Sequence, residues 1–146
     1  MLALGLVTFL ASAGLYIRTS FAGLPGGDAG ELIAEACQLG VAHPPGYPLF
    51  TYLAWLAVRG LPAWLGSPAH RVNLACCVAG ALAAVLLYRT ISRTARLAVA
   101  ALSRTGSGGS PAHLSMEVSA AFVALWFAFS PDVWLYSVGA EVFGAC

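Results

Sequence analysis

The sequence predicts an all-α membrane protein with about three transmembrane helices and a short interfacial helix in the first loop. The first observation is composition: of 146 residues, 60% are hydrophobic and 9% are charged, and the mean hydropathy is +0.82. Soluble domains carry about 45–50% apolar and about 25% charged residues. The second observation is that three apolar stretches approach the roughly 20 residues that cross a bilayer. A water-soluble enzyme and a disordered chain are both excluded.

The first predicted span is residues 1–24. It reaches this length if Arg18 extends its guanidinium group toward the membrane interface. The alternative is a cleaved signal peptide, because residues 2–10 form a short apolar run and residues 11–13 fit a small-residue cleavage site. No basic segment precedes the apolar run, which favours a retained helix.

The next segment, residues 25–70, contains the most polar part of the sequence. Three of the six acidic residues follow the first span directly: Asp28, Glu31 and Glu35. Asp28 and Glu31 have the spacing of a capping box, in which Asp28 accepts hydrogen bonds from the first N–H groups of a helix and Glu31 is its partner. A carboxylate held at a membrane surface can also act as a general base. Both interpretations are open on spacing alone, and they are compatible.

The rest of this loop is predicted to fold back and then form a short helix. The run from Pro44 to Pro48 holds three prolines and a glycine, which is typical of a stiff connector. His43 precedes it and either hydrogen-bonds a phosphate or sugar hydroxyl or has a purely structural partner. Residues 49–58 are apolar but too few to cross a bilayer, so we expect an interfacial helix with Pro48 at its N-terminus.

The second and third spans are predicted at residues 71–89 and 114–136. Seventeen uncharged residues lie between Arg71 and Arg89. The third span has Trp126 and Trp134 as interface anchors, while Pro131 and Asp132 leave its far boundary open.

Topology follows from the loops between these spans. Residues 90–113 form a loop rich in Arg, Gly and Ser, and Arg-rich loops lie on the cytosolic side. The loop at 25–70 and the last residues, 137–146, then share the opposite, lumenal face. A spanning helix at 49–58 would reverse this assignment.

Four motifs along the chain belong to one recognisable pattern. The first two are Gly-Gly-Asp-Ala-Gly-Glu-Leu-Ile at 26–33 and Leu-Gly-Val-Ala-His-Pro-Pro-Gly-Tyr-Pro-Leu-Phe at 39–50. The others are Arg-Val-Asn-Leu at 71–74 and Ala-Glu-Val-Phe at 140–143. The chain resembles, from residue 24 to 143, the N-terminal part of a GT-C-type multi-pass protein O-mannosyltransferase family. The vertebrate member is an endoplasmic-reticulum enzyme that modifies receptor domains of the plexin and hepatocyte-growth-factor-receptor type.

The resemblance implies an inverting transfer of mannose in the endoplasmic-reticulum membrane. The donor is dolichyl-phosphate mannose, a polyprenyl-phosphate sugar in the lipid bilayer, and the acceptors are Ser or Thr hydroxyls of protein domains in the lumen. No cofactor is implied. Such enzymes place an acidic catalytic residue in the first lumenal loop, where Asp28 lies. Asp28 would take the hydroxyl proton, and Glu31 is either its capping partner or a second acid that orients the acceptor.

Three further residues are candidates for binding donor or substrate. Arg71, at the lumenal end of the second span, is the candidate cation for the donor phosphate, with simple extension to the interface as the alternative. His43 and Glu141 are predicted on the same face of the membrane. Asp132 should face protein or a cavity, because a lipid-facing carboxylate is costly. No metal site is predicted, although two or three lumenal carboxylates can hold a divalent ion.

The family continues through many more spans, so we expect this chain to be a truncated product that is inactive alone. A non-catalytic alternative is a small membrane scaffold or assembly subunit, in which Gly5, Gly14 and Gly80 allow close helix packing with a partner. A transporter piece would hold its acids inside helices near the midplane, whereas Asp28 follows a Pro-Gly-Gly turn outside the span. The net charge of +1 and the scattered arginines exclude a nucleic-acid partner.

Overall fold

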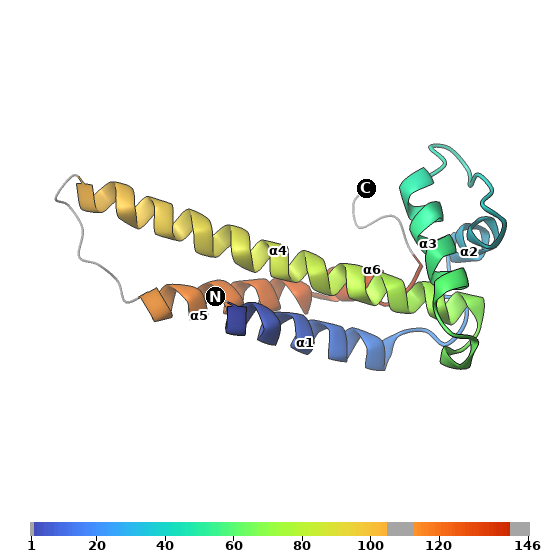
Figure 1. Ribbon diagram of the computed structural model, residues 1–146, viewed down its shortest axis with the longest axis horizontal. Coiled ribbons are helices and arrows are strands. Elements are labelled where there is room, and N and C mark those ends of the chain that lie inside the picture. The colour runs from blue at the N-terminus through green and yellow to red at the C-terminus, as the bar shows by residue number, and fades with distance from the viewer. Residues whose placement is uncertain (1, 105–112, 141–146) are drawn as a thin grey trace.

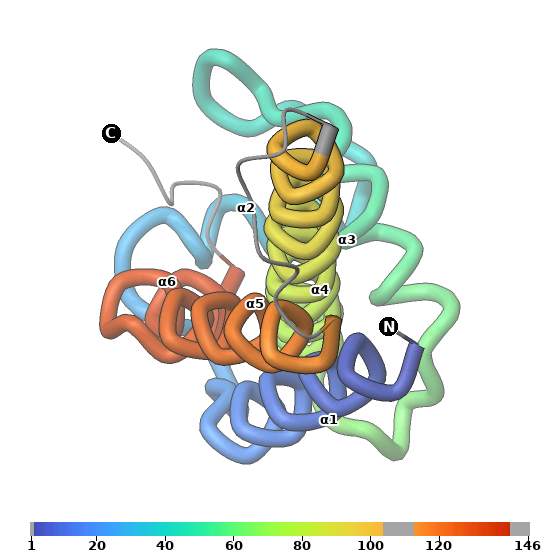
Figure 2. The backbone as a smooth tube through the Cα atoms, turned by 90° about the vertical axis from the view of Figure 1, so that its left-hand side faces the viewer, coloured from blue at the N-terminus to red at the C-terminus, as the bar shows by residue number. Residues whose placement is uncertain are grey.

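The computed structural model describes residues 2–104 and 113–140, and all regular structure in these two ranges is helical. The elements are α1 (Leu2–Thr19), α2 (Ala29–Gln38), α3 (Pro48–Gly60), the 3₁₀ helix η1 (Ala63–Leu65), α4 (Pro68–Arg104), α5 (His113–Ala128) and α6 (Pro131–Ser137). Helices α1 and α5 lie along the same side of α4, and α2 and α3 gather where α4 begins (Figure 1, Figure 2). The predicted all-α membrane class is confirmed.

Two helices of the described chain, α1 and α4, are long and apolar enough to cross a membrane. The bent pair of α5 and α6 makes a third candidate if it counts as one span. Helix α1 ends at Thr19, earlier than the predicted boundary at residue 24. The reason is that the backbone after α1 bonds to other segments: the N–H of Phe21, for example, donates to the Val138 carbonyl at 3.3 Å.

Helix α4 is much longer than the predicted second span at 71–89. It has 37 residues and continues through Arg104, so most of the predicted loop at 90–113 is helical. Residues 90–104 contain no Gly or Pro and are rich in Ala, Leu and Arg, which are strong helix formers. The helix is about 55 Å long, against a hydrocarbon core of about 30 Å. Its arginine-bearing end therefore continues beyond the core as a helix.

The predicted third span at 114–136 is broken near its far end. Helices α5 and α6 meet at 70°, because Pro131 has no N–H to continue the helix and Ser130 is extended, with φ −62° and ψ 143°. The Tyr16 hydroxyl of α1 donates to the Ala128 carbonyl at 2.6 Å. This bond gives a partner to a carbonyl at the end of α5, which lipid could not supply. Asp132 is exposed in the first turn of α6 rather than turned toward the described protein.

Small side chains let these helices approach closely. A Cβ atom at Gly80 would lie 2.5 Å from the Ser137 Oγ, so a glycine is needed where α6 crosses α4. An apolar cluster joins α2 and α3 to the beginning of α4, and it holds the predicted loop at 25–70 against the other helices. Its buried members are Ala29, Ile33, Ala36, Ala54, Ala69, Val72 and Ala140.

A buried polar cluster joins α5 to α4 farther along the bundle. The Glu117 side chain, 10% exposed, accepts hydrogen bonds from the Tyr88 hydroxyl and from Ser92 Oγ, the latter at 3.2 Å. Its Oε1 also lies 3.7 Å from Arg96 Nη1. Tyr88 is about 30 Å along α4 from the residue where that helix begins. This cluster therefore lies far from the end that carries α2 and α3.

Candidate acid–base site at the beginning of helix α2

The site starts with the turn that leads into α2. Gly27 has a left-handed φ of 64°, a conformation that favours glycine. Asp28 follows at the N-cap position with φ −81° and ψ 0°, and it makes no side-chain capping hydrogen bond. The predicted capping box is therefore wrong. A capping residue normally has an extended backbone that aims its oxygen at the first N–H groups, whereas the helical torsions of Asp28 leave its carboxylate 53% exposed.

The loop between α2 and α3 folds back as the prolines predict. Helix α2 ends at Gln38, and its C-cap residue, Leu39, has a left-handed φ of 54°. The His43 carbonyl then accepts a hydrogen bond from the Gly46 N–H at 2.8 Å, across a turn with a cis bond between Pro44 and Pro45. This turn returns His43 to the first turn of α2.

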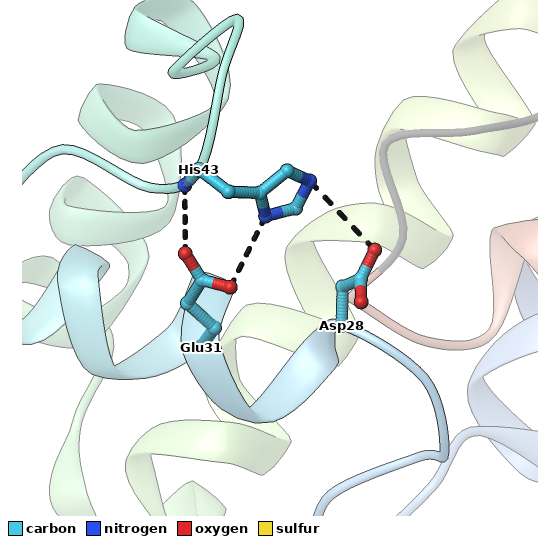
Figure 3. Close-up of polar contacts among 3 residues, drawn as sticks. All are labelled: Asp28, Glu31 and His43. Atoms are coloured by element: carbon cyan, nitrogen blue, oxygen red, sulfur yellow. Dashed lines mark hydrogen bonds and ion pairs between the residues drawn. The ribbon is translucent and has the colours of Figure 1, made fainter.

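Asp28, Glu31 and His43 come together there and form what we call the acid–base group. The His43 backbone N–H donates to Glu31 Oε1 at 2.7 Å, and its ring Nδ1 lies 3.1 Å from Glu31 Oε2. Its Nε2 faces Asp28 Oδ2 at 3.8 Å (Figure 3). Because a carboxylate only accepts, Nδ1 carries the hydrogen of the contact with Glu31. The imidazole ring therefore lies between two carboxylates, fixed by one and directed at the other.

The two acids differ in their electrostatic surroundings. The backbone N–H of His43, and next its ring, stabilise the charged form of Glu31 and hold the pKa of that carboxyl below its usual range. Asp28 has an exposed carboxylate whose contact with His43 is longer than a hydrogen bond. The two side chains are similarly exposed, at 44% for Glu31 and 53% for Asp28, but Glu31 is a charged anchor for the loop, whereas Asp28 makes no close hydrogen bond with His43.

Arg71 is not part of the acid–base group. Its Nη1 donates to the Val58 carbonyl at 2.6 Å and to the Leu61 carbonyl at 3.0 Å, which joins the end of α3 to the first turns of α4. The predicted site residue Glu141 lies outside the described residues. No three His, Cys, Asp or Glu side chains within 2–104 and 113–140 are placed to hold a metal ion together.

Two polar residues near the beginning of α4 were not singled out as site residues. His70 Nδ1 lies 2.9 Å from the Phe21 carbonyl, and Asn73 also bonds that carbonyl, at 2.8 Å. Both therefore hold the segment that leads to Asp28. For Asn73, the sequence offered one signal, a polar amide in an otherwise apolar helix. Such a group needs a hydrogen-bond partner when it is buried.

The chain matches the family model described as the protein O-mannosyl-transferase TMEM260 N-terminal domain, over residues 28–146. It is 46% identical over 135 residues to protein O-mannosyl-transferase TMEM260 of Mus musculus, covering 92% of this chain and 16% of that protein. The corresponding protein of Dictyostelium discoideum is 32% identical over 135 residues, covering 92% of this chain and 14% of its own. The chain thus spans less than a fifth of the length of these relatives, and no solved structure matches it. The chain belongs to the protein O-mannosyl-transferase TMEM260 family, in the part that forms its N-terminal domain.

Proposed function

We propose that this chain supplies the general base of a protein O-mannosyltransferase. The observation that carries the proposal is the acid–base group, in which an exposed Asp28 carboxylate lies beside a histidine that Glu31 holds in place. Both curated relatives are named protein O-mannosyl-transferases, which supports a transferase over other membrane functions.

The proposed reaction moves mannose from dolichyl-phosphate mannose to a Ser or Thr hydroxyl of a receptor domain. The hydroxyl oxygen attacks the sugar carbon from the face opposite the phosphate, and its proton passes to the Asp28 carboxylate. The bond between the sugar carbon and the phosphate oxygen breaks, so the configuration inverts and dolichyl phosphate leaves. His43 presents Nε2 beside Asp28. With the ring hydrogen on Nδ1, Nε2 accepts a hydrogen bond from a sugar hydroxyl, and only the protonated ring can donate from Nε2 to the donor phosphate.

Two residues outside the acid–base group complete the proposal. Arg71 is the cation proposed to face the donor phosphate, and its Nη1 contacts with the end of α3 hold it in place. A cation that is already positioned stabilises developing negative charge without reorganisation. Glu141 is proposed to line the site from the segment that follows α6.

The proposed location is the endoplasmic-reticulum membrane, with the acid–base group on the lumenal side. Arg89, Arg93 and Arg96 lie toward the other end of α4, and positively charged segments remain cytosolic. The polyprenyl chain of the donor would then lie in the bilayer beside the apolar helices, and the protein acceptor would arrive from the lumen.

A microsomal transfer assay tests the catalytic assignment. The assay uses dolichyl-phosphate mannose, a purified receptor domain and a form extended to the length of the curated relatives. Asp28→Asn removes the base while keeping the size of the side chain, and we expect a loss of at least about a hundredfold in rate. The present chain, assayed alone, is expected to transfer no mannose.

Glu35→Gln is the matched control. It makes the same acid-to-amide change on the same helix, but the Glu35 carboxylate lies against Gly40, at the far end of α2. This variant should keep the unaltered rate. An Asp28→Asn enzyme that transfers mannose as fast as the Glu35→Gln enzyme would show that Asp28 is not the base.

The scaffold alternative loses part of its support in the fold. Two of its three glycines face neighbours within the chain, because a Cβ atom at Gly80 would meet Ser137 and one at Gly5 would lie 3.4 Å from the Tyr88 ring. Only at Gly14, of these three, would a Cβ atom meet nothing within 4 Å. A pure scaffold would also keep its function after Asp28→Asn, so the same assay separates the two.

A further inference from the structure

Asn73 is fully buried in α4 and bonds three backbone groups of two other segments. Its Nδ2 donates to the Phe21 carbonyl at 2.8 Å and to the Gly23 carbonyl at 2.9 Å. Its Oδ1 accepts a hydrogen bond from the Ala140 N–H at 2.9 Å. The side-chain amide has two donor hydrogens, and each is directed at a different carbonyl of the chain after α1.

Each of the two bonded segments is adjacent in sequence to a residue of the proposed function. Residues 20–28 connect α1 to α2 and end at Asp28, and residues 138–140 follow α6 and lead directly to Glu141. A direct bond joins them too, from the Phe21 N–H to the Val138 carbonyl at 3.3 Å. Irregular backbone needs partners that it cannot supply itself. Asn73 bonds both segments at once, whereas His70 and Ser67 bond the segment after α1.

A cavity of about 240 Å³ opens between the segment after α1 and the end of α6 with Gly139, close in sequence to Asp28. The two walls touch each other, since a Cβ atom at Gly139 would lie 2.9 Å from the Cγ of Pro25. The cavity is lined by Phe21, Pro25, Gly26, Leu135, Tyr136 and Gly139. Its shape depends on how the segment after α1 sits against the segment after α6, and Asn73 sets that arrangement.

We propose that Asn73 is a positioning residue for Asp28, which it places by holding the segment after α1 against the segment after α6. The proposal rests on the proposed function, because it concerns the same transfer reaction. A general base must lie within hydrogen-bond reach of the hydroxyl that it deprotonates, and a misplacement of about 1 Å costs on the order of a hundredfold in rate. Asn73 touches neither substrate in this scheme and acts through the backbone.

The first test uses Asn73→Leu in the extended form, a change that removes all three hydrogen bonds at similar side-chain volume. We expect kcat to fall by about tenfold to a hundredfold, with the KM for dolichyl-phosphate mannose within about twofold of the original. Thr90→Val makes a similar polar-to-apolar change at an exposed position of α4 and should alter neither constant. His70→Ala removes the second side-chain contact with the Phe21 carbonyl, which lies nearer the surface. We expect a smaller fall in kcat for this variant.

The second test measures the arrangement without activity. A Pro25→Cys/Gly139→Cys pair should form a disulfide under mild oxidation. A Cβ atom at Gly139 would lie 3.2 Å from the Cβ of Pro25, so a shift of a few tenths of an ångström brings the pair to the separation of about 3.5–4.5 Å found in a disulfide. Single-cysteine variants serve as controls. We expect the yield to fall several-fold when Asn73→Leu is added, and less with His70→Ala.

The outcomes separate this inference from the proposed function. If Asp28→Asn keeps full activity, the proposed function fails, while the cross-linking yield still tests the role of Asn73 in the arrangement. If Asp28→Asn abolishes transfer but Asn73→Leu leaves kcat and the cross-linking yield unchanged, Asn73 is not a positioning residue. Should Asn73→Leu fail to fold, Asn73→Ser, whose shorter side chain cannot bond all three backbone groups, decides by the same two measurements.

Discussion

Asp28 and Glu31 carry the same carboxyl group three residues apart, yet their surroundings give them different roles. Glu31 accepts two hydrogen bonds from His43, one from the backbone and one from the ring. Asp28 is exposed and faces the remaining ring nitrogen at 3.8 Å. One acid therefore holds the loop, and the other is accessible to a substrate. Substitutions at the two positions should have different consequences.

The contact between Glu31 and His43 should depend on pH in one direction. The folded structure lowers the pKa of Glu31 below its ordinary value of 4.5, so folding favours the charged form. The stabilisation is present above the unfolded pKa and is lost as pH falls through the lower, folded pKa. The His43 backbone amide, followed by NMR in detergent micelles, should titrate with a midpoint below 4.5. Glu31→Gln should abolish that titration, and a midpoint above the ordinary value would contradict the assignment.

The sequence predicts the members of the acid–base group but not all of their contacts. Asp28, Glu31 and His43 stand in unusual motifs, and the prolines after His43 predict the loop that returns it to α2. The capping box was wrong because the Gly-Gly turn gives Asp28 helical torsions, which spacing does not reveal. The bonds of Asn73 join residues 50 or more positions apart, and no local pattern encodes such a pairing.

At the scale of the helices, α6 crosses α4 closely because residue 80 of α4 is a glycine. Gly80→Ala would place a Cβ atom 2.5 Å from Ser137 Oγ and 2.8 Å from its Cβ. We expect this overpacking to cost about 1–3 kcal/mol in the free energy of unfolding, measured by denaturant titration in micelles. Gly14→Ala is the control, because a Cβ there meets nothing within 4 Å, and alanine should stabilise the helix by up to about 1 kcal/mol. Equal effects at both positions would refute the close crossing.

Helices α4 and α5 depend in turn on the buried carboxylate of Glu117. Glu117→Leu would leave the Tyr88 hydroxyl and the Ser92 hydroxyl without this acceptor. A buried polar group that loses its partner costs about 1–3 kcal/mol, so we expect a loss of that size in the free energy of unfolding. Glu117→Gln keeps one acceptor oxygen and should cost less. Asp132→Asn, at an exposed position, should change the free energy of unfolding by less than about 0.5 kcal/mol. If Glu117→Leu is as stable as Asp132→Asn, the buried cluster does not stabilise the packing of α4 against α5.

Helix boundaries were the part of the fold that charge patterns predicted least well. Arg89, Arg93 and Arg96 mark where an apolar span ends, but arginine is a good helix former, and α4 continues through all three. Conversely, the apolar run at 114–136 looks continuous by hydropathy, and Pro131 bends it. A change in polarity therefore indicates where a membrane boundary lies. The end of a helix is indicated instead by residues that interrupt the backbone hydrogen bonds, such as proline.

At the scale of the whole molecule, the short helices determine on which side each end of α4 lies. Helix α3 has 13 residues and is about 20 Å long, too short for a hydrocarbon core of about 30 Å. If it does not cross, the end of α1 and the beginning of α4 lie on the same side of the membrane. The beginning of α1 then lies on the other side, beside the middle of α4, as Figure 1 shows. The acid–base group and the arginines of α4 should consequently face opposite compartments.

Labelling of sealed microsomes with a membrane-impermeant maleimide tests this arrangement. Val41, in the loop of the acid–base group, is 80% exposed, and Leu97, near the other end of α4, is 72% exposed. Leu97→Cys should react in intact vesicles because arginine-rich segments stay cytosolic, whereas Val41→Cys should react only after permeabilisation. The unsubstituted chain, with Cys37 and Cys76 half-buried and Cys77 buried, gives the background. Reaction of Val41→Cys in intact vesicles would place Asp28 on the cytosolic side, where no lumenal acceptor could reach it.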